Sequence, residues 1–132
     1  MAHSDYKKYL SYFLFLIGIH SLIVGVGLLL IPPSVLKFFG FIDYKESFFQ
    51  AQGGVFHFAM SVAYVMAGLK VEKSIRLIQF IVAVKLLAFV FLFLYYLFVL
   101  PAWLILLSGV GDGLMGLIVY TLYKRCEFKG KP

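Results

Sequence analysis

The feature that most constrains this chain is a set of four apolar stretches, each long enough to cross a lipid bilayer. They cover residues about 9–31, 48–69, 77–100 and 102–123 of the 132 in the chain. A bilayer core about 30 Å thick takes about 20 residues of α-helix, and a helix satisfies its own backbone hydrogen bonds in lipid. We therefore predict an all-α membrane protein, a four-transmembrane-helix bundle that forms a single domain over residues 1–132.

The composition argues against a water-soluble fold. Hydrophobic residues make up 63% of the chain and charged residues only 14%, and a soluble domain of this size has too little interior to bury so much apolar surface. The net charge of +6 would otherwise suggest nucleic acid. However, the basic residues lie at the ends of the apolar stretches, where membrane topology accounts for them. We expect contact with the lipid bilayer and no nucleic-acid partner.

The longest connection follows the first apolar stretch. Pro32 and Pro33 end that stretch, and residues 34–39 followed by Gly40 have the pattern of a short helix closed by a glycine. Because this segment carries phenylalanines, we predict a short interfacial helix in the first extracytoplasmic loop.

Lysine and arginine are distributed unevenly between the two sides of the predicted membrane. Nine of the twelve lie in the N-terminal segment, in the turn around residues 70–76 and in the C-terminal tail, whereas the two loops of the opposite side hold only Lys37 and Lys45. The remaining one, Lys85, lies inside an apolar stretch. The positive-inside rule then predicts that both termini are cytoplasmic, and we assign the chain to a bacterial inner (cytoplasmic) membrane.

Each apolar stretch contains one ionisable residue near its middle: His20, His57, Lys85 and Asp112. At 1.5 Å of rise per residue, all four lie about 13–18 Å from the cytoplasmic ends of their helices. Ionisable side chains at this depth are costly in lipid and normally face the bundle interior, where they pair with one another. We therefore predict one polar cluster at the membrane midplane. Gly111 and Gly113 flank Asp112 and would let a backbone or a ligand approach it.

The second stretch supports such a cluster, because its small and polar residues share one helical face. Gln50, the pair Gly53 and Gly54, His57, Ser61, Tyr64 and Gly68 recur at steps of three and four residues. The candidate ligand-binding or proton-handling residues are therefore His20, His57, Lys85, Asp112, Ser61, Tyr64, Gly111 and Gly113. In this scheme Lys85 and Asp112 are charge partners, and the histidines exchange protons or bind the ligand.

Structural interpretations stay open beside this one. Lys85 and Asp112 could form an ion pair that fixes how two helices dock, and each histidine could bond a backbone carbonyl or a hydroxyl group. We find no motif for a catalytic residue, a metal site or a phosphate loop, so we predict no metal and favour a role that is not enzymatic. A haem b held by His20 and His57, or a quinone, is the alternative cofactor.

Three segments carry a resemblance to a known group: residues 25–32, residues 36–40 and residues 49–54, which open the second stretch. Over residues 18–68 the chain resembles the DoxX-like superfamily and related small bacterial four-helix membrane proteins. Many of those proteins have Arg or Glu just before the glycine pair, where this chain has Gln50 and Gln52. The resemblance implies a compact four-helix bundle with cytoplasmic termini, and some members of the group are linked to quinone-associated redox work.

The sequence therefore predicts a small integral membrane protein that binds or passes a small polar ligand, or a proton, through a polar cavity at the midplane. One alternative is an accessory subunit of a membrane redox complex, associated with quinone or haem. Another is a packing subunit with no site of its own. Since four helices make a thin wall, we expect a homo-oligomer or a place in a larger membrane complex.

Overall fold

The computed structural model describes residues 3–41 and 48–126. Within these residues the chain is all-α, as predicted, with five α-helices and one short 3₁₀ helix, η1 (Val71–Lys73). The α-helices are α1 (His3–Leu30), α2 (Pro33–Phe38), α3 (Phe48–Leu69), α4 (Ile75–Phe98) and α5 (Trp103–Arg125). Lys45 and the tail beyond residue 126 lie outside the described residues.

Three of the four long helices are apolar and long enough to cross a membrane: α1 from Asp5, α4 and α5. They support an integral membrane protein in contact with lipid, as the sequence predicts. The fourth long helix, α3, has the predicted bounds but is not one of these three, because glutamines, glycines and His57 dilute its apolar sequence. Helix α1 begins six residues before the predicted apolar stretch, since a helix continues into water where hydropathy no longer marks it.

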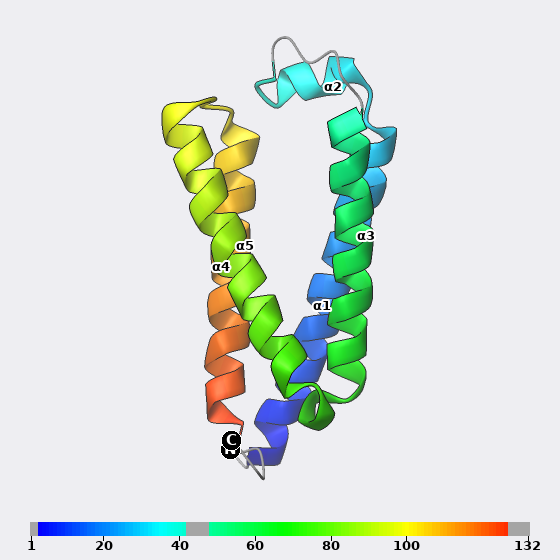
Figure 1. Ribbon diagram of the computed structural model, residues 1–132, viewed down its shortest axis with the longest axis vertical. Coiled ribbons are helices and arrows are strands. Elements are labelled where there is room, and N and C mark those ends of the chain that lie inside the picture. The colour runs from blue at the N-terminus through cyan, green and yellow to red at the C-terminus, as the bar shows by residue number, and fades with distance from the viewer. Residues whose placement is uncertain (1–2, 42–47, 127–132) are drawn as a thin grey trace.

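The long helices form two pairs, α1 with α3 and α4 with α5 (Figure 1). The pairs lie close together at the end that holds the two termini and diverge toward the end that holds α2. The main hydrophobic core lies in the half near the termini. Its buried members are Leu10, Leu14, Ile17, Met60, Tyr64, Ala67, Val71, Ile78, Ile81, Val119, Tyr123 and Cys126.

Helices α1 and α3 are in backbone contact at Gly25 and Gly54. A Cβ at Gly25 would lie 2.9 Å from the carbonyl oxygen of Gly54, and a Cβ at Gly54 would lie equally close to that of Gly25. Small residues permit this approach in membrane helix pairs. Polar side chains then bond carbonyl groups along the whole interface: Ser11 to Gly68, Ser61 to Gly18, Ser21 to His57, and Gln50 to Leu28 and Ile31.

Helices α4 and α5 pack through three glycines of α5. A Cβ added at Gly109, Gly113 or Gly116 would lie 2.9–3.1 Å from a side chain of α4. The spacing of four and then three residues places these glycines on one helical face. The close packing at Gly116 is against Lys85, so it fixes the height at which this lysine meets α5.

Helix α2 connects the two pairs at their divergent end. Pro33 begins it, and Gly40, with φ +95°, ends it in a Schellman motif. The amide groups of Gly40 and Phe41 donate to the carbonyl oxygens of Lys37 and Leu36, at 3.0 and 3.1 Å. The end of α2 then meets the start of α5.

The contact between α2 and α5 is centred on Trp103. Its ring lies 5.2 Å from that of Phe39 and 6.2 Å from that of Phe38, and its indole N–H donates to the carbonyl oxygen of Phe38 at 3.3 Å. Ala102 packs beside Gly40. This short helix therefore spans the divergent end of the molecule (Figure 1).

Candidate functional site

A cleft of about 460 Å³ lies between the two helix pairs. Polar residues and a glycine line one part of it: His20, His57, Ser108, Gly111 and Asp112. The rest is lined by apolar side chains: Val24, Leu28, Phe41, Leu92, Leu104, Ile105, Leu107 and Met115. Along α1 and α5 most of these apolar residues lie nearer to α2 than His20 and Asp112 do, whereas Met115 lies on the core side of Asp112. The cleft therefore has a polar floor and apolar walls.

Lys85 and Asp112 form an ion pair at this floor. The Lys85 ammonium donates to Asp112 Oδ1 at 2.5 Å, and the two side chains are 5% and 16% exposed. The ammonium also lies 5.4 Å above the ring of Tyr64, an arrangement that attracts a cation. A lone charge at this depth of a membrane helix costs about 2.5–3.5 kcal/mol. The pairing therefore stabilises both charges.

Ser21 and His57 form the second polar pair, across the α1–α3 interface. The Ser21 hydroxyl donates to the carbonyl oxygen of His57 at 3.0 Å, and its oxygen lies 3.1 Å from His57 Nδ1. A hydroxyl group has only one proton to donate. We therefore assign the imidazole proton to Nδ1, which donates to Ser21 Oγ and leaves Nε2 as an acceptor.

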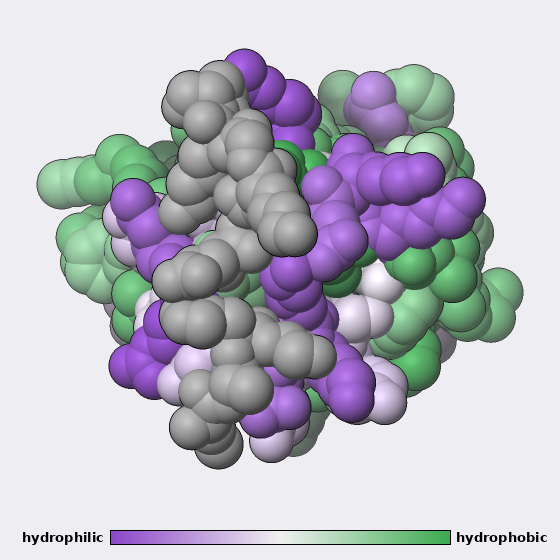
Figure 2. Space-filling view, turned by 90° about the horizontal axis from the view of Figure 1, so that it is seen from below, coloured by the Kyte–Doolittle hydropathy of each residue, from purple (hydrophilic) through white to green (hydrophobic). Residues whose placement is uncertain are grey.

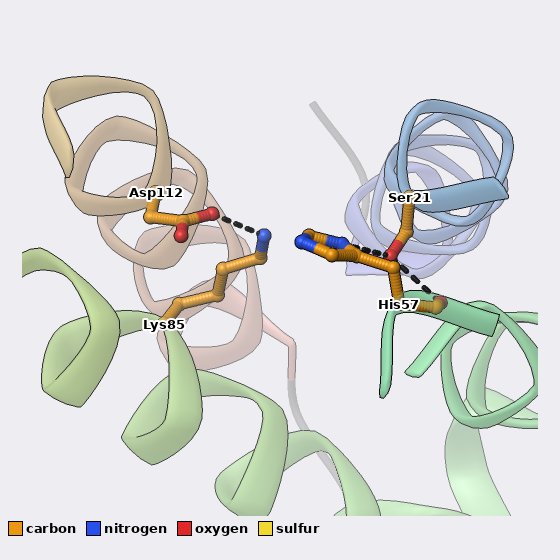
Figure 3. Close-up of polar contacts among 4 residues, drawn as sticks. All are labelled: Ser21, His57, Lys85 and Asp112. Atoms are coloured by element: carbon orange, nitrogen blue, oxygen red, sulfur yellow. Dashed lines mark hydrogen bonds and ion pairs between the residues drawn. The ribbon is translucent and has the colours of Figure 1, made fainter. Parts of the chain in front are cut away.

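The two pairs face each other across the floor (Figure 3). The Lys85 ammonium and the His57 ring point toward one another from opposite helix pairs. Ser21 holds the ring from behind, and Asp112 holds the lysine from its side. With a neutral imidazole the floor has no net formal charge, and it still offers N–H donors from Lys85 and acceptors on His57 and Asp112. Such a set binds a neutral group that can both accept and donate hydrogen bonds.

The structure brings five of the predicted site residues to the cleft, four of them in its lining and Lys85 behind Asp112. His57, Asp112 and Gly111 line it, and Lys85 joins it through Asp112. His20 also lines the cleft, but it is exposed on the molecular surface and makes no hydrogen bond within the described residues. It is therefore at the edge of the cluster and not in a closed interior.

Three predicted site residues lie outside the cleft lining. Ser61 is buried in the α1–α3 interface, where its hydroxyl donates to the carbonyl oxygen of Gly18 at 2.8 Å. Tyr64 is a core residue, only 2% exposed, beneath the Lys85 ammonium. At Gly113 a Cβ would lie 2.9 Å from the Phe89 ring, whereas at Gly111 its nearest neighbour would be Met115, 3.9 Å away. Gly113 thus packs closely against α4, whereas Gly111 leaves open space beside the cleft.

Sequence reasoning missed Ser21, Ser108 and the apolar walls as parts of the site. Ser21 shares a helical face with Gly18 and Gly25, which identifies a packing interface but not the orientation of a histidine on another helix. Phe41 reaches the cleft only because the Schellman turn at Gly40 reverses the chain. That contact is tertiary, so no local sequence pattern predicts it.

Within residues 3–41 and 48–126, no three His, Cys, Asp or Glu side chains lie close enough together to hold a metal ion. His20 and His57 both line the cleft, so a haem between them stays an alternative. Comparison with known protein families, curated proteins and solved structures found no match for this chain. The resemblance to the DoxX-like superfamily therefore stays a prediction.

Proposed function

We propose that α1, α3, α4 and α5 all cross the membrane, with both termini in the cytoplasm of a bacterial cell and α2 at the extracytoplasmic surface. The direction of the four helices supports this arrangement, since the N-terminus, the α3–α4 turn and the end of α5 meet at one end (Figure 1). In α3, Gln50 and Ser61 bond carbonyl groups of α1 and His57 accepts from Ser21, so these polar residues lie on the face packed against α1, whereas Gln52, in the second turn, is exposed.

We further propose that the protein binds a small, neutral, amphipathic molecule in the cleft. The observation that carries this proposal is the polar floor of zero net charge under apolar walls. Ligand sites are mostly apolar, with a few polar groups that fix orientation. A polar head would accept from Lys85 and donate to His57 Nε2 or to Asp112, and an apolar body would lie along Leu92 and Leu104.

The tightly packed core beneath the polar floor favours binding of a ligand over its passage across the membrane. The main core is packed from Leu14 and Ile17 across to Ile81 and Val119, each of which is fully buried. A ligand that crossed to the cytoplasmic side would have to open this core. An amphipathic molecule would instead enter from the surrounding lipid, between the two helix pairs where they diverge.

The closed Lys85–Asp112 pair favours a second candidate, a packing subunit in which the pair only docks α4 on α5.

A quinone is itself a neutral amphipathic molecule, so the redox-accessory alternative is a case of the first proposal. The haem version of the redox-accessory alternative is tested by an absorption spectrum of the purified protein. Bound haem gives a Soret band, and a colourless sample excludes it.

The direct test uses a decanol that carries a photoactivatable diazirine, with the protein in lipid nanodiscs. We expect saturable labelling of cleft walls such as Leu92 and Leu104, mapped by mass spectrometry. Unlabelled decanol should compete, whereas decane, which has no polar head, and decanoate, which is charged, should compete poorly.

A matched pair of variants separates the cleft from the lipid-facing surface. Gly111→Leu adds a side chain in the cleft lining, and Gly27→Leu adds the same side chain where a Cβ would meet nothing within 4 Å. We expect Gly111→Leu to abolish saturable labelling and Gly27→Leu to retain it. Labelling that never saturates, or that both variants retain equally, would overturn the proposal and favour the packing role.

A further inference from the structure

A second pocket, of about 470 Å³, lies at the end of the molecule that holds the termini. It is formed by the first turns of α1, the last turn of α3 and η1, and it shares no lining residue with the cleft. Its charged side chains are Lys7, Lys8, Lys70, Glu72 and Lys73. Four lysines and one glutamate give it a strongly positive charge.

One of the four lysines is neutralised within the pocket. Lys7 forms an ion pair with Glu72 at 2.5 Å, which ties α1 to η1. Lys8, Lys70 and Lys73 form no ion pair within the part of the chain that the structure describes. Three cationic side chains from two separate segments therefore surround one cavity, as an anion site requires.

The pocket also has an apolar border. Tyr12 and Leu69 line it, and both are exposed, at 68% and 67%. The basic residues directly precede the apolar part of α1 and directly follow the end of α3. Figure 2 shows this end face, on which hydrophilic side chains cover much of the visible surface and hydrophobic ones lie mainly at its left and right edges. A phosphate bound here would thus be next to surface that suits acyl chains.

We propose that this pocket binds the phosphate group of an anionic phospholipid from the surrounding leaflet. The shared chemistry is a phosphate oxyanion held by lysine ammonium groups, and the adjoining apolar residues favour a lipid over free phosphate. Basic pockets on the cytoplasmic side of membrane helices bind such head groups, and juxtamembrane lysines are attracted to anionic leaflets. Lys8 reaches the phosphate from α1, and Lys70 and Lys73 reach it from the α3–α4 turn.

The test counts lipids retained in native mass spectrometry, after extraction from nanodiscs of equal parts phosphatidylglycerol and phosphatidylcholine. We expect the wild-type chain to retain one phosphatidylglycerol in preference to phosphatidylcholine. Each lysine at an anionic surface contributes about a factor of five, so Lys8→Gln/Lys70→Gln should lower this retention about twenty-five-fold.

Arg76→Gln/Lys124→Gln is the matched control, because it removes two positive charges at the same end but outside the pocket lining. We expect the control to retain the lipid. Equal loss in both double variants would show general surface attraction and overturn the proposal, as would unchanged retention in both. Displacement by inorganic phosphate as effective as that by phosphatidylglycerol would instead assign the pocket to a free anion.

Discussion

Removal of one partner of the Lys85–Asp112 pair should destabilise the protein more than removal of both. Loss of one member of a buried ion pair costs about 3–5 kcal/mol, whereas replacement of both by apolar residues is often neutral. Lys85 is the more deeply buried, at 5% exposure against 16% for Asp112. Asp112→Leu, which leaves the lysine without its partner, should therefore be the more harmful single change.

The expected losses of stability follow from these exposed fractions. We expect the free energy of unfolding to fall by about 3–4 kcal/mol for Asp112→Leu and by about 2–3 kcal/mol for Lys85→Met, in keeping with the insertion cost of a lone charge. Lys85→Met keeps the side-chain stem that packs against Gly116. The double variant should lie within about 1 kcal/mol of wild type. The coupling energy of the cycle is then at least about 4 kcal/mol.

The assay is reversible unfolding in mixed micelles by titration with sodium dodecyl sulfate, followed by helical circular dichroism and by the fluorescence of Trp103, the only tryptophan in the chain. Additive effects, with the double variant losing the sum of the two single losses, would refute the pairing argument. So would a larger loss for Lys85→Met than for Asp112→Leu.

Two further predictions concern the α1–α3 interface. Gly25→Ala places a Cβ 2.9 Å from the Gly54 carbonyl oxygen and should cost about 1–3 kcal/mol, whereas Gly27→Ala, in open space, should be neutral or stabilising; equal effects in the micelle assay would contradict the close contact. Ser21→Ala removes the acceptor of His57 Nδ1–H and should cost about 0.6–1.7 kcal/mol. Nitrogen NMR of labelled histidine should show the Nδ1–H form of His57 in the wild type and its loss in Ser21→Ala, and a wild-type Nε2–H signal would refute the assigned tautomer.

The helical architecture follows directly from hydropathy. Apolar stretches of about 20 residues between charged turns admit few other folds, and Pro33 and Gly40 delimit α2 as their chemistry requires. The helix ends differ from the predicted ones because hydropathy detects lipid contact and not backbone hydrogen bonding. Helix α1, for example, continues through Lys7 and Lys8 to His3.

The candidate site is only partly visible in the sequence. Asp112 and Lys85 stand out because an isolated charge in an apolar stretch needs a partner, and the two are paired in the structure. Periodicity marks the face of α3 that carries Ser61 and His57, but it does not say which of them faces a neighbouring helix and which faces a cleft. That difference depends on the divergence of the helix pairs, which follows from tertiary packing near the termini.

The most direct test of the account is whether the cleft admits water to the middle of the membrane. In a Cys126→Ala background, Ser108→Cys places a thiol in the cleft lining, and Val110→Cys places one at similar depth on the exposed side of α5. A thiol reacts through its thiolate, which forms in water and not in lipid. We expect a methanethiosulfonate reagent to modify Ser108→Cys, decanol to protect it, and Val110→Cys to stay unmodified. An unreactive thiol at position 108, or one that decanol does not protect, would contradict a ligand-binding cleft.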